Sequence, residues 1–174
     1  KTSMRIEHKF GDKVFVDYCG KKLRITDRQT GTQTEVEVLV GIMGGSQYIY
    51  VEATATQQLD DFLKGMGNML AYYGGSPQAI VPDNLKSAVT KASNYEPDIN
   101  RNFAAFGLHY NTTILPTRSG KPKDKPLVES AVRMVYRHIF FPLRDMVFFS
   151  LGDLNAAIAK AVSYTHLTLP TSTH

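Results

Sequence analysis

A short apolar run leads into a proline and then a carboxylate in the stretch Ala79-Ile80-Val81-Pro82-Asp83-Asn84. The β-branched residues predict a buried strand at Ala79–Pro82, and Asp83 follows it directly. In open α/β sheets, ligands and metal ions bind outside the carboxyl ends of the strands, because loops there present side chains from a rigid sheet. Asp83 is therefore the first candidate functional residue, and the neighbouring elements decide which other acids can lie near it.

Three strands are predicted before this stretch. Lys13–Tyr18 has apolar residues on both faces, Val36–Ile42 alternates apolar residues at period two, and Tyr48–Ala53 is rich in aromatic and β-branched residues. Turn residues separate them at Asp27–Gly31 and Gly44–Ser46. Strands joined by short turns pair with their neighbours, so the first half is predicted to be an antiparallel meander.

After the third strand, apolar residues recur every three and four positions, which predicts helices. The first of these helices connects the meander to Ala79–Pro82, so that strand is predicted to run parallel to the first strand. The predicted elements beyond the meander, besides Ala79–Pro82, are helix Leu59–Tyr73, helix Asn100–Leu108, strand Thr112–Pro116, helix Leu127–Pro142 and helix Leu151–Ala161. This order predicts an α/β ribonuclease-H-like fold, with a mixed five-stranded sheet of three antiparallel strands followed by two parallel ones, flanked by helices.

The composition is that of one globular domain. The 174 residues are 43% hydrophobic and 21% charged, which is enough for a sizeable core. A formal net charge of +4 fits a polyanionic partner without establishing one. The single cysteine, Cys19, excludes an internal disulfide framework and a cysteine-rich zinc site, and without an evident histidine base it is not expected to act as a nucleophile. No apolar run is long enough for a membrane span, and residues 1–10 lack the apolar core of a signal peptide, so a cytoplasmic protein without a membrane partner is expected.

The ends of the chain are interpreted separately from its core. We expect residues 1–10 to be the remnant of a linker, residues 11–142 to form the catalytic core and residues 143–161 to form a helical extension. The chain begins with Lys1 instead of methionine, which suggests an internal fragment. Residues 162–174 resemble an in-frame translation of a transposon-end adapter from sequencing libraries and are expected to be an artefact tail; a genuine Thr-rich tail is the alternative.

Three elements that lie side by side in the predicted topology each carry one acid: Asp17, Asp83 and Glu129. Asp17 sits in an apolar strand, where desolvation of a carboxylate is costly, so a compensating cation is expected. Mg²⁺ takes oxygen ligands and is usually held by carboxylates together with substrate phosphates. Two such ions about 4 Å apart can stabilise both the attacking and the leaving oxygen of an in-line displacement at phosphorus. The three acids therefore predict phosphodiester cleavage and transfer.

Basic residues around these acids are candidate DNA contacts. A basic loop leads directly into the helix of Glu129, and two arginines follow Glu129 at four-residue spacing on one flank of that helix. The predicted DNA-binding residues are Lys86, Arg118, Lys121, Lys123, Lys125, Arg133 and Arg137. Ordinary solvated lysines, an ordinary charged loop and salt pairing on an exposed helix face are the alternatives for these residues.

Five segments in order carry a family resemblance. They are Val16-Asp17-Tyr18-Cys19-Gly20, Val81-Pro82-Asp83-Asn84-Leu85-Lys86-Ser87-Ala88-Val89, Tyr95-Glu96-Pro97-Asp98-Ile99-Asn100-Arg101, Lys121-Pro122-Lys123-Asp124-Lys125 with Val128-Glu129, and Phe148-Phe149-Ser150-Leu151 to Ile158. Together they resemble the integrase core of IstA-type insertion-sequence transposases, which are DDE enzymes of the retroviral-integrase superfamily. The similarity extends from Gly11 to Ala161. Pro126-Leu127 depart from the small or basic pair that usually precedes Val-Glu in that family.

The resemblance implies that Asp17, Asp83 and Glu129 form a catalytic triad that binds two Mg²⁺ ions, with Mn²⁺ able to substitute. It implies cleavage at transposon ends, transfer of the freed 3′ hydroxyl into target DNA, assembly of a homo-oligomer on DNA, and an AAA+ helper ATPase of the IstB type. It also implies a bacterial cytoplasmic protein associated with the nucleoid. Two alternatives stay open: a ribonuclease-H-like nuclease that only hydrolyses, and an inactive DNA-binding or assembly fragment.

Overall fold

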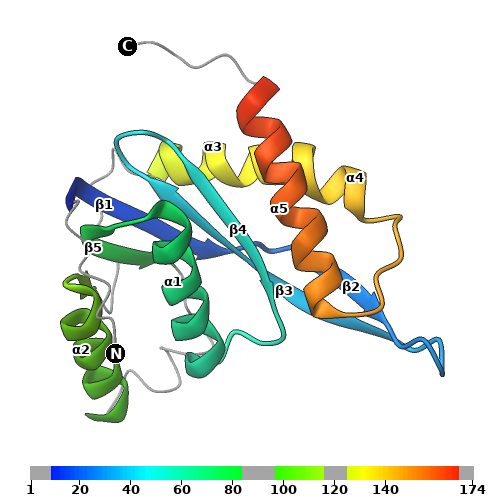
Figure 1. Cartoon of the computed structure of the whole chain (residues 1–174), viewed down its shortest axis with the longest axis horizontal. Coiled ribbons are helices and arrows are strands. Elements are labelled where there is room, and N and C mark those ends of the chain that lie inside the picture. Colours follow the sequence, from blue (N-terminus) through cyan, green and yellow to red (C-terminus); the bar gives the residue numbers. More distant parts are fainter. Residues whose placement is uncertain (1–8, 84–96, 116–124, 169–174) are drawn as a thin grey trace.

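The computed structural model describes residues 9–83, 97–115 and 125–168 (Figure 1). The elements in chain order are β1 (Lys9–Tyr18), β2 (Leu23–Thr26), β3 (Gln33–Met43), β4 (Ile49–Thr54), α1 (Leu59–Tyr73), β5 (Ser76–Asp83), α2 (Pro97–Tyr110), β6 (Thr113–Ile114), α3 (Lys125–Val135), the π-helical turn η2 (Tyr136–Phe140), α4 (Phe141–Leu143) and α5 (Leu151–Thr168). None of the helices in these ranges is long and apolar enough to cross a membrane.

The sheet has antiparallel strands first and parallel strands after the crossover helix. β1 pairs antiparallel with β3 and parallel with β5, β6 pairs parallel with β5, and β4 pairs antiparallel with the other edge of β3. This arrangement confirms the expected mixed α/β sheet of a ribonuclease-H-like domain. The crossover through α1 is what makes β5 parallel to β1.

The described part of the chain has one strand more than the five expected. β2 pairs with β3 at Leu23↔Val36, beyond the last β1 pair at Tyr18↔Leu39. β1 and β2 therefore run in the same direction along β3 and behave as one long strand interrupted at residues 19–22. The sequence did not predict β2 because this strand is only four residues long and carries a charged side chain, Arg24.

Helices cover both faces of the sheet, and each face has its own apolar core (Figure 1). Val14 and Val16 of β1 pack on the side of α1 and α2. Phe15 of β1 and Val81 of β5 pack on the side of α3 and α5. Burial of each such large apolar side chain contributes about 1.5–3 kcal/mol. Because side chains alternate along a strand, these two clusters define which strand positions face which pair of helices.

Gly65 allows α1 to pack closely on β3. A Cβ atom at Gly65 would lie 2.7 Å from Leu39 Cδ2, so a larger side chain would push the helix away from β3. Gly74 ends the helix at φ 71°, and its N–H donates to the carbonyl of Leu70. Gly65 is therefore a packing residue, and Gly74 ends the helix directly after the expected last residue, Tyr73.

The helix that carries Glu129 does not end at Pro142 as expected. α3 begins at Lys125, and the helical path continues through η2 and α4 to Leu143. Proline has no N–H and clashes with the carbonyl four residues earlier in an α-helix. The π-helical turn avoids this clash, because Phe141 N–H donates to the carbonyl of Tyr136, five residues back. α5 likewise continues beyond the expected Ala161 to Thr168.

Candidate active site

Asp17 and Asp83 lie in register on neighbouring parallel strands. Asp83 is the last residue of β5, and Asp17 is one residue before the end of β1. The two positions are partners in the β1–β5 ladder. Neighbouring strands are separated by about 4.8 Å. The backbone therefore brings two of the three predicted acids together at the carboxyl ends of the strands; the side chain of Asp83 lies outside the described residues.

Asp17 is half-buried on the face of the sheet that α3 and α5 cover. Its neighbours two positions away, Phe15 and Cys19, belong to the core on that face. The pKa of the Cys19 thiol is raised to about 12, mainly by burial and further by the charge of Asp17. The thiol therefore stays protonated near neutral pH, which agrees with the expectation that Cys19 is no nucleophile. Val81, two positions before Asp83 on β5, belongs to the same core.

Glu129 is exposed in α3, the helix that covers this face. The apolar side of α3, with Val128, Ala131 and Val135 buried, packs on the sheet and contacts β1 and β3. Glu129 follows the buried Val128 by about 100° around the helix, on the exposed flank.

A hydrogen bond joins the helical segment after Glu129 to the residues that follow β1. Gly20 N–H donates to the hydroxyl of Tyr136 at 3.1 Å. Glu129 precedes Tyr136 by two helical turns, or about 10 Å, and lies on the same side of the helix. Asp17 precedes Gly20 by three residues, and α3 and β1 run in the same sense (Figure 1).

Lys21 is a cation at this edge that the sequence analysis did not assign to the site. Its ammonium nitrogen lies 5.1 Å from the ring centroid of Tyr136 and 5.8 Å from that of Phe141. Both rings belong to the helical segment that follows Glu129. The sequence contains Lys21 within a short basic cluster, but its place beside the helix depends on the interruption between β1 and β2, which no local pattern indicates.

The predicted DNA-binding residues are only partly placed. Lys125 and Arg133 are exposed on α3, as a DNA contact requires. Arg137 is exposed in η2, where the π-helical geometry interrupts the four-residue spacing that was expected to align it with Glu129. The four others, Lys86, Arg118, Lys121 and Lys123, lie outside the described residues.

The donor set at this edge suits a hard metal ion. The candidate ligands are carboxylates, the oxygen donors that Mg²⁺ and Mn²⁺ prefer, and the buried, protonated Cys19 offers no thiolate for zinc. Among the side chains that the structure describes, no group of three or more His, Cys, Asp or Glu is close enough to hold a metal ion. The side chain of Asp83 is not among those described, so this statement does not concern the full set of three acids.

Two proteins that are similar in sequence to this chain are named as transposases. A Sinorhizobium fredii protein with the transposase name y4bL/y4kJ/y4tB is 44% identical over 159 residues, and the Burkholderia multivorans protein named for insertion sequence IS408 is 36% identical over 163 residues. These matches cover 91% and 94% of this chain but only 31% and 32% of the two relatives, so the chain spans about a third of their length. No family model matches the chain.

A solved structure shares the fold. The catalytic core domain of BIV integrase superposes with a TM-score of 0.59, over 90% of this chain and 85% of that chain. At 9% sequence identity this likeness concerns the fold alone. It agrees with the ribonuclease-H-like topology seen in the strand order.

Proposed function

Because this chain belongs to the insertion-sequence transposases and has the fold of a retroviral integrase core, we propose that it is a DDE catalytic core that cuts transposon ends and joins them to target DNA. The observation that supports this most directly is the pairing of Asp17 with Asp83 at the carboxyl ends of β1 and β5. The helix of Glu129 covers the same face of the sheet. A DDE polynucleotidyl transferase needs three carboxylates on these three elements.

In this proposal, Asp17, Asp83 and Glu129 hold two Mg²⁺ ions, or Mn²⁺ in their place. Bound ions of this kind make a water or hydroxyl oxygen a competent nucleophile and stabilise charge on the attacking and leaving oxygens. Asp17 is half-buried, and the residues two positions away on the same face of β1, Phe15 and Cys19, belong to the core. Lys21, held above two aromatic rings, can neutralise a phosphate that approaches the same edge.

The proposed reaction has two displacements at phosphorus. In the first, a water oxygen bonds to phosphorus while the bond from phosphorus to a 3′ oxygen breaks, and that oxygen takes up a proton to become a 3′ hydroxyl. In the second, this hydroxyl loses its proton and bonds to a phosphorus of the target, and a target 3′ oxygen leaves and is protonated. The number of phosphodiester bonds is unchanged in the second step, so it needs no external energy source.

The proposed partners follow from the family. They are transposon-end and target DNA, further copies of the protein in the active complex, and an AAA+ helper ATPase of the IstB type. The names of the relatives as transposases of insertion sequences support the DNA partner. We place the protein in the bacterial cytoplasm at the nucleoid, where both DNA substrates are found.

The test is a strand-transfer assay with the longer transposase that contains this core, pre-cut end DNA from its own element, a target plasmid and Mg²⁺. We expect joined product from the unchanged protein. Asp83→Asn, Asp17→Asn and Glu129→Gln should each abolish joining while DNA binding persists, because they keep side-chain size and remove charge. Asp153→Asn, at an exposed position in the first turn of α5, is the matched control and should join normally.

Each alternative has its own outcome in this assay. Cleaved product without joined product, with all controls intact, would favour the ribonuclease-H-like nuclease. DNA binding without either product would favour an inactive assembly module. Normal joining by Asp83→Asn would show that the three acids are wrongly assigned.

A further inference from the structure

Exposed apolar side chains are concentrated in the segment from α4 to the start of α5. Phe141, Met146, Val147 and Phe149 are each between 42% and 60% exposed. Single exposed apolar residues are common on protein surfaces, but a contiguous group of large ones marks an interaction site. Leu143 of α4 and Phe148 of the connection to α5 are buried in the core.

A pocket of about 260 Å³ opens beside these side chains, between β2 and the connection from α4 to α5. Its buried lining is apolar, and its exposed lining is charged apart from Met146. The buried residues are Leu23, Leu143, Phe148 and Leu154, and the exposed ones are Lys22, Arg24, Arg144, Asp145 and Met146. The pocket therefore combines an apolar floor with a rim of three cations and one carboxylate.

The wall of this pocket is held in place by contacts to the β2–β3 hairpin. Thr26 N–H donates to the carbonyl of Phe148 at 2.7 Å, and the guanidinium of Arg28 lies 4.0 Å from the ring centroid of Phe149. Such contacts reduce the conformational entropy that a partner would have to remove on binding. The pocket is thus a preformed feature of the described structure.

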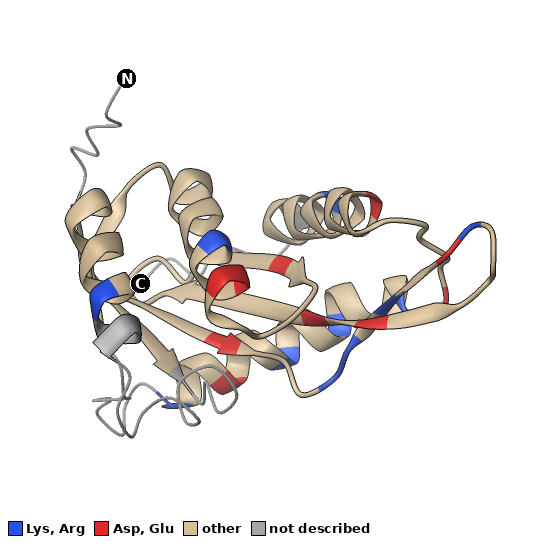
Figure 2. Ribbon diagram, turned by 90° about the horizontal axis from the view of Figure 1, so that it is seen from below, with Lys and Arg blue, Asp and Glu red and all other residues tan. Residues whose placement is uncertain are grey.

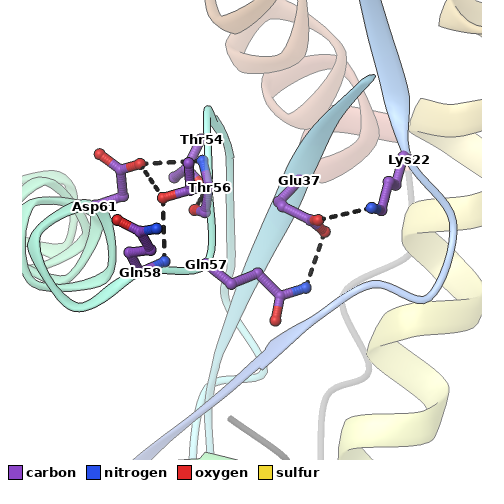
Figure 3. Close-up of polar contacts among 7 residues, drawn as sticks. All are labelled: Lys22, Glu37, Thr54, Thr56, Gln57, Gln58 and Asp61. Atoms are coloured by element: carbon purple, nitrogen blue, oxygen red, sulfur yellow. Dashed lines mark hydrogen bonds and ion pairs between the residues drawn. The ribbon is translucent and has the colours of Figure 1, made fainter. Parts of the chain in front are cut away.

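Lys22 is fixed at one side of the rim by a carboxylate of the sheet. Its ammonium nitrogen lies 3.0 Å from Glu37, which also accepts a hydrogen bond from the side-chain amide of Gln57 at 2.9 Å (Figure 3). The side chain of Glu37 is only 13% exposed, so Lys22 is oriented by a carboxylate that lies deeper in the structure. Arg144 is close to Asp145, at 3.7 Å, but both side chains are largely exposed, and such a pair contributes little.

We propose that this pocket and the exposed apolar side chains around it dock a protein partner, through a segment with one large apolar side chain flanked by carboxylates. The apolar side chain would occupy the floor, and the carboxylates would pair with Arg24 and Arg144. The volume of the pocket is that of one large side chain, and the composition, rich in Arg, Phe and Met, is typical of the centre of protein interfaces. This docking goes beyond the proposed DNA chemistry and does not depend on it.

The charge pattern favours a protein over a nucleic acid. Both signs of charge occur along the β2–β3 hairpin (Figure 2), where Glu35 is the register partner of Arg24 and Asp27 directly follows β2. Mixed charge weakens the attraction for a phosphate backbone, which depends on many uncompensated cations. A phosphate backbone also has no apolar group with which to cover Phe141 and Met146.

The experiment is a selection of short random peptides from a display library against the 174-residue chain, with a parallel selection against the double variant Arg24→Glu, Arg144→Glu. The unchanged chain should enrich peptides with an aromatic or leucine residue flanked by Asp or Glu. A synthetic peptide of the enriched sequence should bind the double variant at least about tenfold more weakly. Thermal unfolding establishes that each variant is folded.

Matched variants separate this surface from general effects. The double variant Lys64→Glu, Lys160→Glu makes the same charge change as Arg24→Glu, Arg144→Glu, at exposed positions of α1 and α5, and should leave peptide affinity unchanged. Met146→Ala should weaken binding, whereas Leu108→Ala, at a 90% exposed leucine of α2, should not.

Three results would overturn the inference. The first is that the selected peptides share no acidic and apolar consensus, and the second is equal peptide affinity for the unchanged chain and for Arg24→Glu, Arg144→Glu. The third is a loss of duplex DNA affinity in Arg24→Glu, Arg144→Glu that exceeds the loss in Lys64→Glu, Lys160→Glu, because the surface would then bind nucleic acid. Strand transfer is not measured in this experiment. A negative result here therefore does not bear on the proposed catalysis, which the strand-transfer assay tests separately.

Discussion

The replacement Asn155→Leu should strongly destabilise the sheet that carries the candidate active site. β4 is an edge strand, and the side-chain amide of Asn155 on α5 closes that edge at Ala53. Ala53 N–H donates to Asn155 Oδ1 at 2.7 Å, and Asn155 Nδ2 donates to the carbonyl of Ala53 at 2.9 Å. One side chain thus satisfies both backbone groups of a residue that is 1% exposed.

The magnitude follows from the two groups that lose their partners. A buried backbone group without a hydrogen bond costs about 1–3 kcal/mol, so the two together cost about 2–6 kcal/mol. Leucine at this half-buried position regains about 1 kcal/mol by burial of apolar surface. We therefore expect Asn155→Leu to lower the free energy of unfolding by about 1–5 kcal/mol, which is about 2–20 °C in Tm for a domain of this size.

Urea unfolding followed by circular dichroism measures this loss as a lower midpoint at an unchanged slope. Asn68→Leu is the matched control, because Asn68 is also a helical asparagine but makes one exposed hydrogen bond, to Glu52. That control should lose less than about 1 kcal/mol. An Asn155→Leu variant within about 0.5 kcal/mol of the unchanged chain would refute the edge-closing role. Concentration-dependent self-association of the variant would add evidence for it, since an unpaired edge strand can pair with another chain.

Three further predictions concern residues near the site and the hairpin. Tyr136→Phe removes the acceptor of Gly20 N–H, and we expect a loss of about 0.5–1.5 kcal/mol in urea unfolding; no loss would mean that the 3.1 Å bond does not hold the helix to β1. With a pKa of about 12, Cys19 should react with iodoacetamide at pH 8 roughly 2,000-fold more slowly than an unfolded thiol, and fast labelling of the folded chain would contradict its burial. The backbone N–H groups of Thr30 and Gln29, in the β2–β3 turn, lower the pKa of Asp27. The stabilising effect of the Asp27 carboxylate is therefore present above the unfolded-state pKa and is lost as pH falls through the folded-state pKa. Asp27→Asn should flatten that part of the stability–pH profile in a comparison of unfolding midpoints, and an unchanged profile would count against it.

The strands and the pairing of two acids could be predicted from local patterns. Period-two alternation located β3, a run of aromatic and β-branched residues located β4, and the crossover helix made β5 parallel to β1. Since Asp17 and Asp83 each stand at the end of a buried strand, parallel pairing brings them to the same edge. The role of Glu129 stays a prediction, because its helix is placed but the side chain of Asp83 is not described.

Contacts between distant residues could not be predicted in this way. Asn155 and Ala53 are 102 positions apart, and a lone asparagine on a helix has no local signal that it closes a strand edge. β2 depends on its partner in β3 more than on its own four residues, since a strand of that length has little intrinsic preference. Both features depend on the assembled sheet, and sequence patterns describe only the elements from which it is assembled.

Pro142 shows how one local rule gave the helix end to within one residue but did not predict the geometry before it. The rule that proline ends a helix places the end at Pro142, and the helical path ends at Leu143 after the π-helical turn η2. A π turn holds one residue more than an α turn, so everything after it is rotated by about 100° relative to a continuous α-helix. Phe141 directly follows this turn, and the ammonium nitrogen of Lys21 lies 5.8 Å from the centroid of its ring. The π turn therefore determines which side chain of α4 lies beside Lys21, just after β1.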